Sequence, residues 1–501
     1  EIRFVEPRYS RRSCDVGSWS LEHLPTKEVP RFRWEPSLPF TAQLANWREP
    51  VILTNTFVTE WKALERWSRD DYLRSKPELA TMTETMAVNE CQMNPSNKNN
   101  AMAKAGLVNS KDNFYSLNVT GEEFFSRYND PNQEQYWYWY GKVAGSLVED
   151  ILPNDGLWVD AQDLEQFGLY MWLSGPDIGP WWHYDQDHNF YVQVAGTKRF
   201  ILIPPWESHK MHPYPQIHPR NHKAQVNFDI PDLNRHHLYE NITDAFIAEL
   251  QPGEVLYIPP YWWHHVRSHV RSVSLASWSQ SGVYRVMRYG LYKRAFAFDT
   301  LPKKSPQRLT AVRFLLQTIA SRIYRDDSTF FQQLVQSRWD PIREEIRLNL
   351  LSRFNTSSIP VDDSTTVGIN SVEINVDNGA REAQEEALLS MQALCGLSEE
   401  SLDDDLKRRL LDDVKASVEA FENCQTKMGA GNKGIGIERR DMQAIRDLEF
   451  ADFTEFILAD EVGAEDVLPF LDVCLAAVQH QQTTPSAASS EEVKPTNEDV
   501  E

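Results

Sequence analysis

The stretch His183-Tyr184-Asp185, continued by His188-Asn189-Phe190-Tyr191-Val192-Gln193-Val194-Ala195, decides the fold of this 501-residue chain. Its polar and apolar residues alternate, as they do on a strand with one polar and one apolar face. Alternate side chains of a strand share a face, so His183 and Asp185 point the same way. Ala195-Gly196-Thr197 then predicts a hairpin turn, after which residues 198–203 return as the partner strand.

A second histidine follows much later, at His264 in the run Tyr257-Ile-Pro-Pro-Tyr-Trp-Trp-His-His. Two imidazoles and one carboxylate suit a non-haem iron(II) ion and leave coordination positions open for other ligands. We therefore predict that His183, Asp185 and His264 hold iron(II), with the cation of Lys198 nearby. His265 stays as an alternative ligand, although neighbouring residues on a strand face opposite ways.

Four ordered blocks of the chain, between Val29 and Gly282, carry a resemblance to a known family. The chain resembles the small JmjC oxygenases of the cupin superfamily, especially asparaginyl hydroxylases of the factor-inhibiting-HIF type. The blocks are Glu49-Pro50-Val51-Ile52-Leu53-Thr54, residues 183–205, residues 212–215 with 225–232, and residues 253–266.

The resemblance implies a mainly β core, a double-stranded β-helix of the jelly-roll or cupin type, with N-terminal α/β elements and a helical C-terminal region. It also implies iron held by His183, Asp185 and His264, with 2-oxoglutarate and O2 as co-substrates. The distal carboxylate of 2-oxoglutarate would meet Lys198, since a buried carboxylate needs a charged partner. The family's other co-substrate contacts fall on Asn189, Tyr138 and Ser277.

The departures from the family pattern lie at co-substrate and substrate contacts. Pro180 stands where the family has a threonine, and Ser277 stands where it has an asparagine. Lys223 aligns with a glutamine that recognises substrate, and Ser279 aligns with a tryptophan that faces it. With Gln225, these two residues are the expected substrate contacts. A cation at Lys223 favours an acidic group in the substrate.

The expected activity is hydroxylation of a side chain in a protein or peptide substrate, with succinate and CO2 as co-products. Three alternatives stay open. A JmjC lysine demethylase uses the same chemistry on an N-methyl group, and a related small JmjC protein acts on an RNA base. The third is a catalytically silent JmjC-like interaction module whose helical extension does the work.

Composition limits the partners. The net charge of −22 repels phosphates and so disfavours nucleic acid, and no run approaches the ~18 apolar residues of a membrane span. Five scattered cysteines predict neither a disulfide framework nor a zinc finger, and they favour the reducing cytoplasm or nucleus. Because the chain begins at Glu1, the secretory-pathway lumen stays an alternative.

The pattern changes along the chain predict six segments. The helical region after the core could form a homodimer interface or pack on the core, and the sequence leaves both alternatives open. The segments are an irregular N-terminal arm at 1–28, the catalytic domain at 29–283 with its core at about 166–282, a helical extension at 284–354, a linker at 355–381, a helical region at 382–480 and a disordered acidic tail at 481–501.

Overall fold

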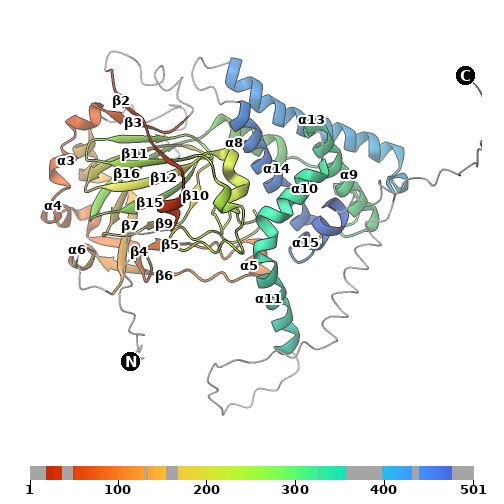
Figure 1. Cartoon of the computed structure of the whole chain (residues 1–501), viewed down its shortest axis with the longest axis horizontal. Helices are drawn as coiled ribbons and strands as arrows, with labels where there is room; N and C mark the ends of the chain where they lie inside the picture. The colour runs from red at the N-terminus through yellow and green to blue at the C-terminus, as the bar shows by residue number, and fades with distance from the viewer. Residues whose placement is uncertain are drawn as a thin grey trace, which may run out of the picture.

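The computed structural model describes residues 19–35, 49–128, 130, 134–153, 168–324, 327–356, 398–430 and 439–476. Two sheets face each other in its N-terminal part, and helices α8–α15 gather at one end of them (Figure 1). This arrangement confirms the predicted β core with a helical C-terminal region.

The larger sheet has nine strands, which pair mostly antiparallel. The metal-side strand β11 lies in its interior, between β14 and β16. In spatial order its strands are β2 (Arg31–Arg33), β3 (Val51–Thr54), β14 (Val255–Ile258), β11 (His188–Ala195), β16 (Ser272–Ser279), β8 (Leu169–Ser174), β7 (Tyr136–Lys142), β4 (Thr81–Val88) and β6 (Phe114–Thr120).

The smaller sheet has five strands and carries both predicted histidine ligands. A separate two-stranded pair, β5 with β9, lies at its margin beside β15. The five strands in order are β1 (Thr26–Glu28), β13 (Ala245–Leu250), β12 (Lys198–Ile203), β15 (Trp263–Ser268) and β10 (His183–Tyr184), and the pair is β5 (Gln92–Met93) with β9 (Gly179–Pro180).

The two faces of β11 belong to different clusters of the core, as its alternating sequence predicts. Phe190, Val192 and Val194 pack on the outer side of the large sheet. Tyr191 packs with Phe200 and other residues between the two sheets. The space between the sheets is therefore the face on which the metal-side residues of β11 lie.

The turn between β11 and β12 requires glycine. Gly196 has a φ of +70°, and a Cβ there would lie 2.1 Å from the backbone oxygen of Arg271. Any side chain would strain the turn and displace that backbone. The turn predicted at Ala195-Gly196-Thr197 is present, but the prediction that residues 198–203 return as the partner strand is wrong. β11 pairs with β14 and β16 in the large sheet, whereas β12 pairs with β13 and β15 in the small sheet, so the turn carries the chain from one sheet to the other.

Short helices cover the outer side of the large sheet and connect the strands. Residues 19–28, expected within an irregular arm, instead form α1 and β1, because β1 finds a parallel partner in β13. The elements are α1 (Trp19–His23), η1 (Phe57–Glu60), α3 (Ala63–Arg66), α4 (Asp70–Arg74), η2 (Pro77–Leu79), α5 (Ala101–Lys104), α6 (Gly121–Arg127), η3 (Gly145–Ile151), η5 (Pro205–Met211) and η6 (Tyr239–Asn241).

The helical part begins directly after β16. Its longest helix before the predicted linker is α9, where Ser305 accepts a hydrogen bond from the backbone N–H of Arg308 and Pro306 stands in the first turn. The elements are α8 (Gly282–Met287), η7 (Arg288–Tyr292), η8 (Ala297–Thr300), α9 (Pro306–Ile323), α10 (Asp327–Leu334), η9 (Val335–Trp339), η10 (Asp340–Ile342), α11 (Arg343–Thr356), η11 (Glu399–Ser401), α13 (Asp404–Ala430), α14 (Arg439–Glu461), α15 (Val467–Phe470) and η12 (Leu471–Ala476).

The apolar stripe of the last helices is buried inside the chain. Phe456 is the exception at 42% exposure, and the buried members are Phe450, Phe453, Ile457, Leu468, Phe470, Leu471 and Leu475. They join the same cluster as Tyr184 and Trp263 of the small sheet. The stripe therefore packs on the core, and a homodimer through it has no support from the structure.

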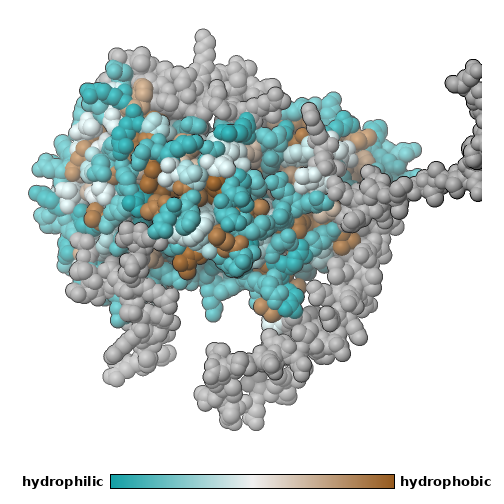
Figure 2. Space-filling model, in the orientation of Figure 1, coloured by the Kyte–Doolittle hydropathy of each residue, from teal (hydrophilic) through white to brown (hydrophobic). Residues whose placement is uncertain are grey.

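Other expectations concern the surface and the cysteines. The view in Figure 2 is mostly hydrophilic, with small separate hydrophobic areas, as the charge predicts. Among the described helices none is long and apolar enough to cross a membrane. Cys91 and Cys474 each take part in a disulfide bond, which the scattered cysteines did not predict. The linker beyond Thr356, residues 382–397 and the tail at 481–501 lie outside the described residues.

Candidate metal centre

The two predicted histidine ligands are direct neighbours across a strand pair. His183 of β10 lies opposite His264 of β15, and their ring centroids are 4.1 Å apart. Asp185 follows β10 by one residue and turns its carboxylate toward them. One ligand atom from each of the three residues lies within 4.8 Å of the other two.

The backbone sets the orientation of both imidazoles. Nδ1 of His183 lies 2.7 Å from the carbonyl oxygen of Trp181, and Nδ1 of His264 lies 3.0 Å from that of Trp262. A carbonyl only accepts, so each Nδ1 carries the hydrogen and each Nε2 keeps a free lone pair. Burial lowers the pKa of His183 to about 3, so this ring is neutral, as a metal ligand must be.

The carboxylate of Asp185 is held on one oxygen. Its Oδ2 accepts the indole N–H of Trp278 at 2.9 Å and the amide of Asn189 at 3.2 Å. Burial acts to raise the pKa of Asp185, but His264, His183 and these two hydrogen bonds outweigh it and leave the pKa below its ordinary value. The residue is therefore an ionised ligand, and the same Oδ2 lies 3.9 Å from Nε2 of His264.

This donor set fits iron(II). Two imidazole nitrogens and one carboxylate oxygen lie close together, and three ligands of this kind leave coordination positions open on the metal for further ligands. The nitrogens are oriented by backbone carbonyls and the carboxylate by two donors, as in established metal sites.

Lys198 lies on the same face of the small sheet as His264. Leu202, four positions further along the same strand, pairs with His264. The backbones of Lys198 and His264 therefore lie about 13 Å apart along the sheet. Lys198 is 1% exposed, and its Nζ donates to the hydroxyl of Tyr191 at 2.7 Å. Nζ also lies 5.8 Å from the ring centre of Tyr138.

No carboxylate pairs with Lys198 among the residues that the structure describes. Burial lowers its pKa to about 7, and an unpaired buried ammonium is unfavourable. An anionic group reaching in from the metal side would supply the missing partner. The side-chain oxygen of Asn189 is also buried without a partner.

The sequence comparisons agree with this geometry. Residues 37–282 match the model of a family described as the cupin-like domain, and relatives aligned with the chain are named for the JmjC domain. This stretch is a cupin-like JmjC domain.

Three relatives illustrate the range of names. Jumonji C domain-containing protein 5 of Drosophila melanogaster is 28% identical over 231 residues, which are 46% of this chain and 54% of that protein. Lysine-specific demethylase 8 of Danio rerio is 26% identical over 287 residues, 55% and 64% respectively. tRNA wybutosine-synthesizing protein 5 of Mus musculus is 34% identical over 97 residues, 19% and 29%. The chain thus spans less than two thirds of each relative.

Two predicted contacts of the cupin-like domain lie on the wrong side of the sheet. Ser277 pairs with Phe190, and Ser279 pairs with His188. Directly paired residues share a face, and Phe190 packs on the outer side. Ser277 and Ser279 are therefore turned away from the metal centre, which corrects their assignment to co-substrate and substrate.

The residue that faces the centre from β16 is Trp278, which the sequence analysis missed. It pairs with Asn189 and bonds Asp185. The alternation of Val273 and Leu275, both fully buried in the outer cluster, would have shown that Trp278 points inward.

The predicted substrate contacts separate in space. Lys223 forms an isolated bridge with His183, and its ammonium donates to the carbonyl of Pro95. Gln225 instead donates its amide to the carbonyls of Pro213, at 3.1 Å, and Arg338, at 2.7 Å. Lys223 is thus beside the centre, whereas Gln225 points toward the helical part.

The adjacent histidines lie apart from the ligand set. The ring of His265 stacks on Phe228 with centroids 4.0 Å apart, and His269 meets Glu249 at 2.9 Å. His265 therefore faces away from His264, as its parity predicts.

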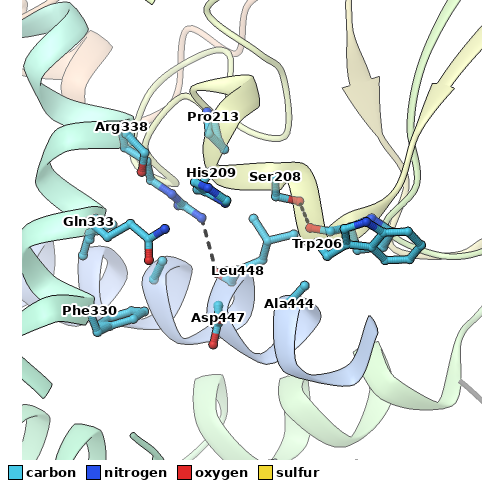
Figure 3. A pocket seen from close by; sticks show the side chains of 14 residues that line it. Trp206, Ser208, His209, Pro213, Phe330, Gln333, Arg338, Ala444, Asp447 and Leu448 are labelled. Atoms are coloured by element: carbon cyan, nitrogen blue, oxygen red, sulfur yellow. Dashed lines mark hydrogen bonds between the residues drawn. The ribbon is translucent and has the colours of Figure 1, made fainter. Parts of the chain in front are cut away.

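A cavity of about 80 Å³ lies elsewhere in the chain, between η5 and α14. Figure 3 shows Ser208 and His209 on one wall and Asp447 and Leu448 on the other. Its lining contains neither a residue of the triad nor Lys198. The cavity is a gap between the cupin-like domain and the helices and forms no part of the metal centre.

Proposed function

We propose that this protein is an Fe(II)- and 2-oxoglutarate-dependent dioxygenase that hydroxylates a side chain of a protein substrate. The observation that carries the proposal is the pairing of the triad with a buried, anion-free ammonium at Lys198 on one face. A metal site alone would suit several divalent ions. The ammonium of Lys198 favours an elongated co-substrate with a second acidic group that extends from the metal to Lys198.

The residues have separate roles in this proposal. His183, Asp185 and His264 would hold the iron, and Lys198 with Tyr191 would receive the distal carboxylate of 2-oxoglutarate. Bound iron and 2-oxoglutarate supply the oxidising power for O2-dependent hydroxylation, with succinate and CO2 as co-products. Asn189 and Trp278 keep the Asp185 carboxylate in place, and Tyr138 walls the co-substrate space.

A protein substrate fits the charge of the chain. The net charge of −22 repels a nucleic acid overall, whereas the ammonium of Lys223 beside His183 offers a local contact for an acidic side chain. Relatives named as lysine-specific demethylases make demethylation of a methylated lysine the second candidate. A relative named for tRNA wybutosine synthesis keeps RNA as a third substrate class.

The test is the visible absorption of the full chain given Fe(II) and 2-oxoglutarate without oxygen. We expect a charge-transfer band in the wild type that Asp185→Ala abolishes, because the iron is lost. Lys198→Ala should bind iron but lose the band at moderate 2-oxoglutarate. If the wild type shows no band, a catalytically silent interaction module becomes the better-supported function.

Product analysis then separates the oxygenase activities. A peptide that gains one oxygen supports hydroxylation, and a methylated peptide that releases formaldehyde supports demethylation. If the protein turned over an RNA oligonucleotide but neither peptide, the proposal of a protein substrate would be rejected.

A further inference from the structure

A buried carboxylate of the helical part contacts the segments that carry the metal ligands. Glu449 of α14 is 1% exposed and lies against the segments that carry the triad. Its Oε1 accepts the side-chain amide of Gln186 at 2.7 Å and the hydroxyl of Tyr261 at 2.7 Å. Gln186 follows the ligand Asp185, and Tyr261 precedes the ligand His264 by three residues.

The same two segments are also joined by their backbones. The N–H of Tyr261 donates to the carbonyl of Asp185 at 2.7 Å. Glu449 adds a second connection from outside the cupin-like domain, so one carboxylate oxygen ties the Asp185 segment to the His264 segment.

Tyr261 needs such support. Its φ is +65°, a left-handed conformation that is uncommon for a bulky residue. Strained backbone of this kind persists where surrounding contacts hold it, and it gathers at functional sites. The contacts that hold Tyr261 are the Glu449 hydrogen bond, the Asp185 hydrogen bond and a stacked ring, Tyr184, at 6.0 Å.

Glu449 has no cation of its own among the described ion pairs. The guanidinium of Arg338 donates to Asp452 at 2.6 Å and to Glu455 at 3.1 Å, and it also reaches the backbone of Leu448 (Figure 3). The second oxygen of Glu449 is buried without a partner. Burying a carboxylate in this way is costly, so simple helix packing does not account for it.

We propose that Glu449 is a positioning residue for the metal centre, holding Asp185 and His264 at their spacing through Gln186 and Tyr261. The inference rests on the proposed function, because it takes the triad to be a metal site. It makes α14 part of the catalytic unit. The helices beyond residue 398 thereby support the site as well as cover the core.

The test measures Mn(II) affinity of the full chain by the loss of the free-ion electron paramagnetic resonance signal. Glu449→Ala should weaken Mn(II) binding about tenfold, the usual effect of losing a residue that orients a ligand. Glu449→Gln keeps an acceptor oxygen and should fall between the wild type and the Ala variant.

Glu455→Ala is the matched control. Glu455 is on the same helix, is 0% exposed, and bonds Arg338, Trp339 and the backbone of Gln216 instead of the ligand segments. This variant should melt at a lower temperature with wild-type Mn(II) affinity. Equal weakening by Glu449→Ala and Glu455→Ala would overturn the proposal.

Tyr261→Phe provides a milder change, since it removes only the hydroxyl that Glu449 accepts. As a single substitution it should weaken Mn(II) binding, but in a Glu449→Ala background it should cause no further loss, because the effects of substitutions at contacting residues are not additive. Fully additive losses, or an unchanged affinity in both single variants, would overturn the positioning role. A wild type that binds no Mn(II) would overturn the proposed function as well, whereas unchanged variants of a binding wild type remove this inference alone.

Discussion

The indole N–H of Trp278 donates to Oδ2 of Asp185 at 2.9 Å, across 93 positions of sequence. Asn189 donates to the same oxygen. Two donors of the large sheet thus hold the carboxylate, and the same oxygen lies 3.9 Å from Nε2 of His264 in the small sheet. The metal centre is therefore assembled from both sheets.

Trp278→Phe should weaken Mn(II) binding about tenfold, because it keeps an aromatic side chain but removes the N–H donor that orients the carboxylate. Titration of the metal into the full chain measures the change. Trp172→Phe is the control, since Trp172 packs 6.1 Å from Trp278 and its indole nitrogen has no partner. Similar losses in both variants would mean that ring packing matters and the hydrogen bond does not.

Lys198 should make 2-oxoglutarate binding depend on pH. Burial lowers its pKa to about 7, so in the free protein the ammonium is charged below pH 7 and increasingly neutral above it. The carboxylate needs the charged form, and we expect affinity to fall about tenfold for each pH unit above 7. Calorimetry with Mn(II)-loaded protein from pH 6 to pH 9 measures this slope, which should vanish in the weakly binding variant Lys198→Met.

Arg338→Met should destabilise the fold by about 3–5 kcal/mol, because it leaves the buried carboxylates of Asp452 and Glu455 without their cation. Urea unfolding gives the free energy. Arg343→Met is the comparison, since the side chain of Arg343 is 44% exposed in its ion pair with Asp472 and should cost about 1 kcal/mol or less. Equal losses would show that burial of the Arg338 pairs has no special weight.

Lys223→Gln should reduce the preference for peptides with an acidic residue near the target while Mn(II) affinity stays the same. Lys223 lies beside His183 but bonds the carbonyl of Pro95, not a ligand. Competing turnover of an acidic peptide and its neutral amide counterpart measures the preference. An unchanged ratio would remove Lys223 from substrate selection.

The triad and the start of the strand that carries Lys198 were predictable because they depend on short-range rules. The two-residue period of a strand brings His183 and Asp185 to one side, and the glycine turn determines that the next strand begins at Lys198. They do not determine which strands pair, and the partners of β12 are β13 and β15, not β11. They also placed Tyr191 between the sheets.

The predictions for β16 and for Gln225 failed for different reasons. Ser277 and Ser279 were placed by the resemblance to the family, and a shift of one residue reverses the face of every side chain on a strand. Gln225 bonds Arg338, 113 positions away, and Glu449 reaches Tyr261 from still farther. Contacts between distant segments leave no local pattern, so the support from α14 could not be predicted.

The distance in sequence between Tyr261 and Glu449, 188 positions, bears on how the protein matures. A ribosome that adds 5–20 residues per second needs roughly 10–40 s to cover that span. The nascent cupin-like domain has all three ligands during this interval but lacks the carboxylate that ties their segments together. Loading with metal should accordingly favour the finished chain over the growing one.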